Sequence, residues 1–310
     1  MNFKNMKTIN ENFKLTESEI KNFNTKGFLM LRGIFSDKFI EYINNKITKE
    51  LQAPSDRYQA GFNRVRYDIF QNDKNVYDLL GDTIFKSVIK RLTNRKMLFT
   101  QALAFELKRS ESNGFPWHIG TQSFGFQRAE DFGCTIWFPL VPIKTNSQRG
   151  GMSYVPTDKV SGKFMYEFID PSVFNFLEEK ISNNRDIFIE EYMQLRDGPL
   201  NDLGMKKLLD YYAVEDNFEL GDALIFDKNV IHKSVKLEDG PIGGRPALAM
   251  RFTDSVAQYD KRRAENLEIP RKYWNYAGPT SLHLQIADKD GTLMKDSPLF
   301  QKDYDKRLID

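Results

Sequence analysis

Residues 97–107 read MLFTQALAFEL and residues 134–141 read CTIWFPLV, two short apolar runs in the middle of a chain of 310 residues. Three further runs of this kind follow at 152–155, 223–226 and 247–252. Turn-forming residues separate the runs, and this texture is typical of a β sandwich or barrel. We therefore expect a mainly β core that begins near Leu98.

The stretch before this core has helical patterns. Thr16 and Glu19 match a capping box, which predicts a short helix that ends near Gly27, followed by an apolar strand at 28–31. The first residues are polar and unpatterned, so we expect residues 1–15 to form a mobile arm.

Two more helices and two additions to the core are expected. Ser36 can cap a second helix, and an apolar stripe predicts a third helix over 82–94. Helical spacing over about 172–212 indicates a helical insertion, which either forms a wall over the barrel mouth or simply packs against the barrel. The pattern then weakens into a polar C-terminal extension over about 255–310, and we assign 16–310 to a single domain.

Composition narrows the class of partner. Positive and negative side chains nearly cancel, to a formal net charge of +2, so no strong field attracts nucleic acid or an anionic membrane. No apolar stretch has the length of a signal-peptide core or a membrane span, and the single cysteine, Cys134, excludes an internal disulfide. We expect a buried packing role for Cys134, a cytoplasmic location, and a small-molecule or protein partner.

Three histidines are the residues best suited to catalysis or metal binding. His118 and His232 each fall at the end of a predicted strand, near the beginning and the end of the β region, with several strands between them. Their spacing alone does not establish a shared metal. His283 has no neighbour of metal-ligand type, so we expect it to be structural.

Motifs surround two of these histidines. They are WHIG at 117–120, TIWFPL at 135–140, GGMSYVP at 150–156, GDALIF at 221–226, HKS at 232–234 and RPAL at 245–248. In order and spacing they resemble the phytanoyl-CoA dioxygenase family, over roughly residues 16–255. The resemblance implies a double-stranded β-helix core, of the jelly-roll or cupin-like kind, and an Fe(II)- and 2-oxoglutarate-dependent oxidoreductase activity.

The metal motif departs from that family at one position. Two histidines and one carboxylate hold Fe(II) in such sites and leave positions open for the 2-oxo acid and dioxygen. The resemblance assigns His118 and His232 as the imidazole ligands, but Gly120 stands where the carboxylate is expected. This replacement is similar to that of the Fe(II)/2-oxoglutarate halogenases, in which chloride fills the vacant position. The resemblance therefore implies halogenation, with chloride as a further cofactor.

Two other outcomes stay open at this position. Another carboxylate, with Glu130, Asp131 and Asp227 as the first candidates, or a water molecule can complete the metal shell of a hydroxylase or other oxidase. Alternatively, the chain is a non-catalytic cupin-like binding protein. The sequence has neither the His-Glu-x-x-His motif of zinc hydrolases nor a glycine-rich phosphate loop, which argues against those classes.

The 2-oxo acid needs a cation for its distal carboxylate, and the guanidinium of arginine offers a planar fork. The resemblance assigns Arg245 and Ser234 to this carboxylate and Trp137 to the pocket wall, although core packing equally explains Trp137. Arg251 is a second candidate, because two-residue alternation places it on the same strand face as Arg245.

Three polar residues, Thr121, Gln122 and Ser123, directly follow Gly120. They can donate hydrogen bonds to a bound anion, although an exposed loop uses the same residue types. The substrate stays open, and a free amino acid, a carrier-bound acyl group, a nucleotide or a natural-product scaffold all fit. The reason is that pocket walls vary independently of a metal motif.

Overall fold

Two antiparallel sheets form the core of the computed structural model, which describes residues 6–52, 64–109, 114–274 and 282–310. In spatial order, the larger sheet contains β1 (Phe28–Leu31), β7 (Ala223–Asp227), β4 (Gly133–Pro139), β9 (Gly244–Asp254), β3 (Met97–Lys108) and β10 (Leu308–Ile309), and β2 (Arg64–Tyr67) also pairs with β3. The smaller sheet contains β6 (Val214–Glu215), β5 (Met152–Tyr154) and β8 (His232–Ser234). The expected jelly-roll core is confirmed.

Alternation along the strands separates two apolar cores. On β9, Leu248 and Met250 pack toward the N-terminal helices, whereas Ala247 and Ala249 face the smaller sheet. Trp137 on β4 also faces the smaller sheet. Odd-numbered residues of β9 therefore project into the space between the sheets, which is the interior of the jelly roll.

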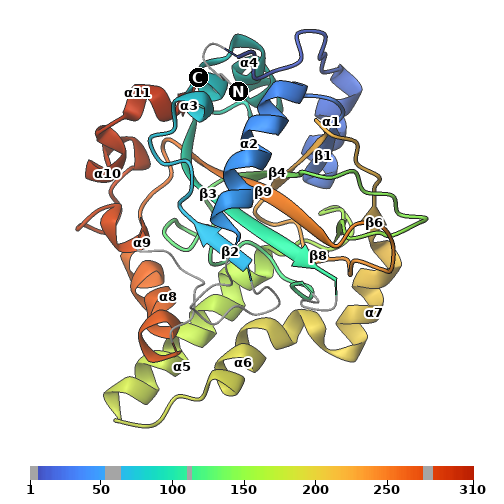
Figure 1. Ribbon diagram of the computed structural model, residues 1–310. Helices are drawn as coiled ribbons and strands as arrows, with labels where there is room; N and C mark the ends of the chain where they lie inside the picture. The colour runs from blue at the N-terminus through green and yellow to red at the C-terminus, as the bar shows by residue number, and fades with distance from the viewer. Residues whose placement is uncertain (1–5, 53–63, 110–113, 275–281) are drawn as a thin grey trace.

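The N-terminal helices cover the outer face of the larger sheet (Figure 1). They are α1 (Glu17–Lys26), α2 (Asp37–Glu50), α3 (Lys74–Gly81) and α4 (Thr83–Thr93). The capping box of Thr16 and Glu19 is present, and Ser36 caps α2 as expected. Cys134 is fully buried in this core, which confirms its packing role. None of the described helices is long and apolar enough to cross a membrane.

The mobile arm expected at 1–15 needs correction. Residues 1–5 lie outside the described part of the chain, but Ile9 and Leu15 are buried in the core. The Asn10 amide donates to the Ile34 carbonyl at 2.9 Å, so the segment is held by backbone pairing as well as by apolar contact. Two buried apolar residues in a polar stretch are too few to produce a periodic signal.

The helical insertion is confirmed and begins slightly earlier than expected. It consists of a π-helix, η1 (Met165–Ile169), followed by α5 (Asp170–Ser182), α6 (Ile189–Asn201) and α7 (Leu203–Tyr212). Asn201 fastens the insertion to the core, because its side chain donates to the Trp117 carbonyl at 2.8 Å and accepts from the Trp117 amide at 3.2 Å. These bonds place the insertion directly over the segment that carries His118.

The C-terminal extension is folded, although its sequence is polar and has only a weak pattern. It contains α8 (Lys261–Trp274), α9 (Leu282–Gln285), η2 (Met294–Asp296), α10 (Pro298–Gln301) and α11 (Tyr304–Arg307), and β10 pairs with the start of β3. Its buried apolar residues, such as Tyr259, Ile286 and Phe300, are widely spaced. Short helices around a small core do not generate a long periodic pattern.

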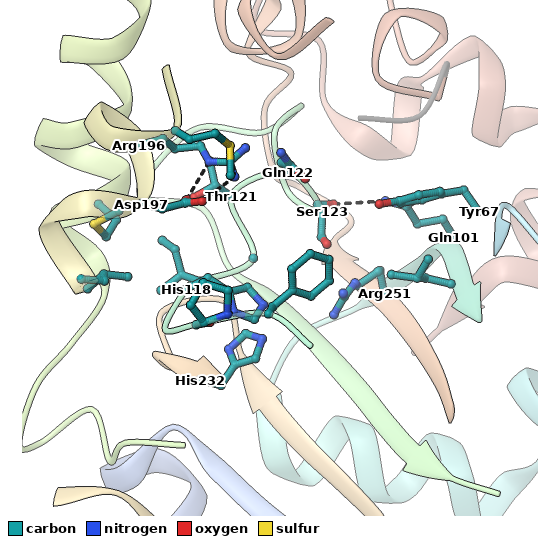
Figure 2. A pocket seen from close by; sticks show the side chains of 18 residues that line it. Tyr67, Gln101, His118, Thr121, Gln122, Ser123, Arg196, Asp197, His232 and Arg251 are labelled. Atoms are coloured by element: carbon teal, nitrogen blue, oxygen red, sulfur yellow. Dashed lines mark hydrogen bonds and ion pairs between the residues drawn. The ribbon is translucent and has the colours of Figure 1, made fainter. Parts of the chain in front are cut away.

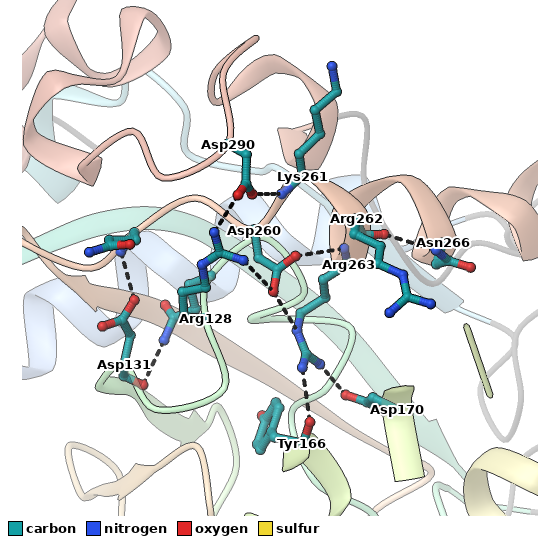
Figure 3. A network of polar contacts seen from close by, with 12 residues as sticks. Arg128, Asp131, Tyr166, Asp170, Asp260, Lys261, Arg262, Arg263, Asn266 and Asp290 are labelled. Carbon is teal, nitrogen blue, oxygen red and sulfur yellow. Dashed lines mark hydrogen bonds and ion pairs between the residues drawn. The ribbon is translucent and has the colours of Figure 1, made fainter. Parts of the chain in front are cut away.

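A buried ion pair joins the extension to the insertion (Figure 3). The Arg263 guanidinium on α8 bonds the Asp170 carboxylate, and it also donates to the Tyr166 carbonyl at 3.0 Å. Both charged side chains are nearly inaccessible, at 4% and 2% exposure. Burial raises the pKa of Asp170 to about 6, so the unpaired carboxylate would be costly here.

We expect Arg263→Met to lower the free energy of unfolding by about 3–5 kcal/mol at pH 8, because it leaves a buried carboxylate without its partner. Urea denaturation measures this. The adjacent Arg262→Met is the matched control, since Arg262 bonds Glu178 at the surface and its loss should cost less than about 1 kcal/mol.

The same comparison has a pH dependence with a defined sign. A carboxyl whose folded-state pKa lies above its unfolded value loses stability as it ionises with rising pH. In Arg263→Met, the loss should therefore shrink as the pH falls from 8 to 5 and Asp170 takes up a proton. An equal loss at both pH values would mean that Asp170 is not the group left unpaired.

Candidate functional site

His118 and His232 lie side by side because their backbones pair directly. The His118 amide donates to the His232 carbonyl and the His232 amide donates to the His118 carbonyl, both at 2.9 Å. Farther along, the Ser234 amide donates to the Phe115 carbonyl at 2.9 Å. The segment before Gly120 thus adds to the edge of β8, and the two imidazole rings have their centroids 4.2 Å apart.

Both rings are oriented by carbonyl oxygens of their own segments. The Nδ1 atom of His118 is 2.8 Å from the Pro116 carbonyl, and that of His232 is 2.9 Å from the Val230 carbonyl. A carbonyl only accepts, so Nδ1 carries the hydrogen in each ring and Nε2 keeps its lone pair. Burial lowers the pKa of His118 to about 4 and that of His232 well below its usual value, so both are neutral. Such a pair suits a divalent metal.

Gly120 is packed against an aromatic ring rather than an open space. A Cβ at this position would lie 3.1 Å from Phe124 Cδ2 and 3.7 Å from the Tyr166 hydroxyl. The tight turn after Gly120, in which the Phe124 amide donates to the Gly120 carbonyl at 3.0 Å, folds the ring back. A Cβ at Gly133 would meet the same ring at 2.6 Å, so two glycines make room for Phe124.

In the part of the chain that the structure describes, no third ligand of the usual type joins the histidines. Within the described residues, no group of three His, Cys, Asp or Glu side chains is arranged to hold a metal. Asp131 accepts from the Gln258 amide at 2.7 Å, Asp227 accepts from the Asn229 amide at 2.6 Å, and neither these nor Glu130 line the histidine cavity.

The carboxylate that does line this cavity is Asp197 on α6 (Figure 2). Its two oxygens accept from Nε and Nη2 of Arg196, each at 2.7 Å. The Arg196 guanidinium therefore pairs with the Asp197 carboxylate in the wall of the cavity. Asp197 also lies close enough to His118 to raise its pKa slightly against the effect of burial.

The surface of the cavity around the histidines is mostly apolar, and polar side chains from several elements also line it. Its apolar lining is Leu103, Phe115, Ile119, Met165, Met193 and Leu200. Thr121, Gln122 and Ser123 also line it, as do Gly120, Tyr67 and Gln101. The Gln122 Nε2 donor is buried and has no hydrogen-bond partner among the described residues. Helix α6 thus forms part of the wall, which decides between the two roles considered for the insertion.

Arg245 and Trp137 lie together between the two sheets, outside this cavity lining. The Arg245 guanidinium lies 5.3 Å from the Trp137 ring centroid, and its Nε donates to the Gly150 carbonyl at 2.6 Å. Nη1 and Nη2 of Arg245 and Nε1 of Trp137 are buried donors without partners in the described part of the chain. Burial lowers the pKa of Arg245 to about 9, which leaves it charged at neutral pH. Two unpaired donors on a buried cation and a third beside it fit an anion.

The other expected residues have distinct positions. Ser234 lies on β8 beside His232 in sequence, and its Oγ accepts from the Phe115 amide at 3.2 Å. Arg251 lines the histidine cavity, and its Nη1 donates to the Thr135 hydroxyl. His283 is fully buried against Phe126, with ring centroids 5.5 Å apart, and does not line the cavity.

Four residues of the site could not be identified from the sequence: Phe124, Arg196, Asp197 and Gln101. Arg196 and Asp197 are adjacent in the helical insertion, and nothing in their spacing links them to a histidine far away in the chain. Gln101 is on a predicted strand, but its side-chain direction depends on a bulge between Phe99 and Gln101. Phe124 is the one of these four residues with a sequence signal, because the glycines at 120 and 133 make room for its ring.

Solved structures of similar fold support the architecture. The epimerase SnoN from nogalamycin biosynthesis, described as non-heme and alpha-ketoglutarate-dependent, has a TM-score of 0.58 at 14% identity, covering 89% of this chain and 94% of that chain. EctD from S. alaskensis has a TM-score of 0.58 at 10% identity, covering 92% and 88%. EvdO2 from Micromonospora carbonacea var. aurantiaca has a TM-score of 0.52 at 14% identity, covering 83% and 98%. No family model matches the chain, nor does any curated protein sequence. At such identities the likeness establishes the fold.

His118→Ala and His232→Ala should each weaken Co(II) binding by at least about 100-fold, because each removes one of two imidazoles from the pair. Isothermal titration calorimetry measures this affinity. His283→Leu is the matched control and should bind Co(II) within about twofold of the parent chain. Equal weakening by all three substitutions would show that the metal is not held by the imidazole pair.

Proposed function

We propose that this chain is an Fe(II)- and 2-oxoglutarate-dependent oxidoreductase that acts on an unactivated C–H bond of a small molecule. The observation that carries the proposal is the pair of neutral imidazoles, His118 and His232, with both Nε2 lone pairs available. Similar folds add support, since one structure of SnoN is described in complex with Fe3+, alpha ketoglutarate and nogalamycin RO.

The chain's own residues hold and orient the reactants. When bound, Fe(II) and 2-oxoglutarate supply the oxidising chemistry, in which dioxygen is reduced while 2-oxoglutarate is converted to succinate and carbon dioxide. The carbonyls of Pro116 and Val230 hold Nδ1 of the two imidazoles, which would leave each Nε2 to bind the metal. Helix α6 covers the cavity with Met193 and Leu200, which limits the access of bulk water.

Arg245 is the residue proposed to hold the distal carboxylate of 2-oxoglutarate. Its free Nη1 and Nη2 atoms form the end of the guanidinium fork, and the Trp137 Nε1 donor lies beside it. The Ser234 hydroxyl can still donate, because the Phe115 amide uses only its oxygen lone pair. A carboxylate bound here would satisfy donors that are otherwise buried without partners.

Anaerobic titration with Fe(II) and 2-oxoglutarate should produce a visible metal-to-ligand charge-transfer band. Arg245→Met should weaken the 2-oxoglutarate affinity by about 10- to 100-fold, as expected for the loss of charged hydrogen bonds, while Co(II) affinity stays unchanged. Arg109→Met is the matched control, because Arg109 lies next to Gly243 in the fold but points to solvent. Absence of the band in the parent chain would instead favour a non-catalytic cupin-like binding protein.

A finer proposal concerns the coordination position left by Gly120. We propose that chloride takes this position, with the Phe124 ring moved aside from its place against Gly120, and that the reaction is a halogenation. Glycine supplies no ligand, and no third carboxylate joins the histidines among the described residues. The alternative is a hydroxylase or other oxidase with a different third ligand, for which Asp197 would first have to leave Arg196.

The charge-transfer band should depend on chloride in the parent chain, in its position or in its 2-oxoglutarate affinity. Gly120→Asp combined with Phe124→Ala supplies a carboxylate and the room for it, and should abolish this dependence. Gly120→Ala with Phe124→Ala is the control, since it adds a methyl group without a ligand and should keep the dependence. A chloride-independent band in the parent chain would contradict halogenation and leave the oxygenase proposal standing.

A further inference from the structure

Arg251 presents one unused edge of its guanidinium to the histidine cavity. The side chain is only 8% exposed, and its Nη1 donates to the Thr135 hydroxyl. Its Nε is buried without a partner, and among the described residues neither Nε nor Nη2 donates to any acceptor. Nε and Nη2 form the side of the guanidinium that matches both oxygens of one carboxylate.

A second arginine in the same cavity uses this edge of its guanidinium to bind a carboxylate. Arg196 uses Nε and Nη2 to bond the two oxygens of Asp197, both at 2.7 Å. Asp197 is thus already matched to a cation, and no carboxylate of the described chain pairs with Arg251. A buried cation that lacks its counter-ion is unfavourable unless a ligand supplies one.

Arg251 and Arg245 are too far apart to serve as one site. They lie six residues apart on β9, which corresponds to roughly 20 Å between their Cα atoms. Arg251 is paired in register with Gln101 and Thr135, whereas Arg245 is paired with Leu107 at the other end of the strand. Arg245 stacks near Trp137 outside the cavity lining, and Arg251 lines the cavity itself. Two separated cations call for two anionic groups.

The residues around Arg251 indicate what the rest of a bound ligand is like. Figure 2 shows its guanidinium on the side of the cavity where the imidazoles lie. Arg251 is near enough to both histidines to lower their pKa values. Most of the remaining wall surface is apolar, with Leu103, Phe115 and Leu200 among the lining residues, and the charges of Arg196 and Asp197 in the wall are paired with each other. A ligand that fits has one anionic end and an apolar body.

We propose that Arg251 binds the carboxylate of the substrate, and that the substrate is a small carboxylic acid with an apolar body. The inference rests on the proposed function for the oxidation of this acid, but the binding itself needs no metal. Gln101 lies beside Arg251 in the strand register, and its Nε2 is held by the Ser123 carbonyl at 3.2 Å. Its side-chain oxygen accepts no hydrogen bond from the described residues, so it can accept one from a donor on the same ligand.

The test compares an acid with its neutral isostere. 4-Methylpentanoate and 4-methylpentanamide share one apolar body and differ in charge, and their binding to the full chain is measured by saturation-transfer difference NMR. The measurement is made on the metal-free protein, and again anaerobically with Fe(II) and saturating 2-oxoglutarate. The parent chain should bind the acid at least about tenfold more tightly than the amide.

Two arginine variants should give opposite patterns. Arg251→Met should weaken the acid to the level of the amide and leave 2-oxoglutarate affinity within about twofold. Arg245→Met should weaken 2-oxoglutarate and leave the acid within about twofold. Arg251→Lys keeps the charge but loses the planar fork, so it should give intermediate acid binding and serves if the methionine variant does not fold.

Three results would overturn the inference. Equal binding of acid and amide by the parent chain would mean that no anion site exists in the cavity. Loss of 2-oxoglutarate binding in Arg251→Met would assign this arginine to the co-substrate. Displacement of the acid by millimolar chloride in the parent chain, but not in Arg251→Met, would assign it to a halide. If only the proposed function is wrong, the charge-transfer band is missing but the metal-free protein still prefers the acid to the amide.

Discussion

The two backbone hydrogen bonds between His118 and His232 are the constraint on which the rest of the site depends. They join segments that are distant in the sequence and lock them in antiparallel register, so both imidazoles emerge at the same point of the smaller sheet. A shift of one residue would turn one ring to the other face of the strand. The insertion reinforces the register from outside, because Asn201 bonds both backbone groups of Trp117.

Much of this arrangement could be predicted because it follows from strand periodicity. The runs at 97–107, 134–141 and 247–252 became β3, β4 and β9, and alternation correctly grouped Arg245 with Arg251 on one face. The pairing of His118 with His232 came from the family resemblance, and the structure places the two imidazoles side by side. Capping residues such as Thr16 act on neighbouring backbone groups, which is why the helix boundaries could be read locally.

The remainder depended on contacts that leave no local pattern. The interpretation of Gly120 assumed an open space beside a missing carboxylate, yet the ring of Phe124 lies there, held by a tight turn and by a second glycine at 133. Asp197 reaches the cavity from a helix whose placement is set by the Arg263–Asp170 pair and by Asn201. Such placements are decided by tertiary packing, where side chains from three separate parts of the chain meet.

Two buried arginines on one strand are unusual in a small β core, since each guanidinium has buried donors without acceptors among the described residues. Each is anchored by a single neutral acceptor, the Gly150 carbonyl for Arg245 and the Thr135 hydroxyl for Arg251, which fixes its direction but does not neutralise it. A site of this kind discriminates strongly, because a ligand that lacks the matching anion leaves the buried donors unpaired. Apolar walls alone distinguish a missing methylene only weakly, so the two cations would contribute most of the selectivity for a diacid co-substrate and an acidic substrate.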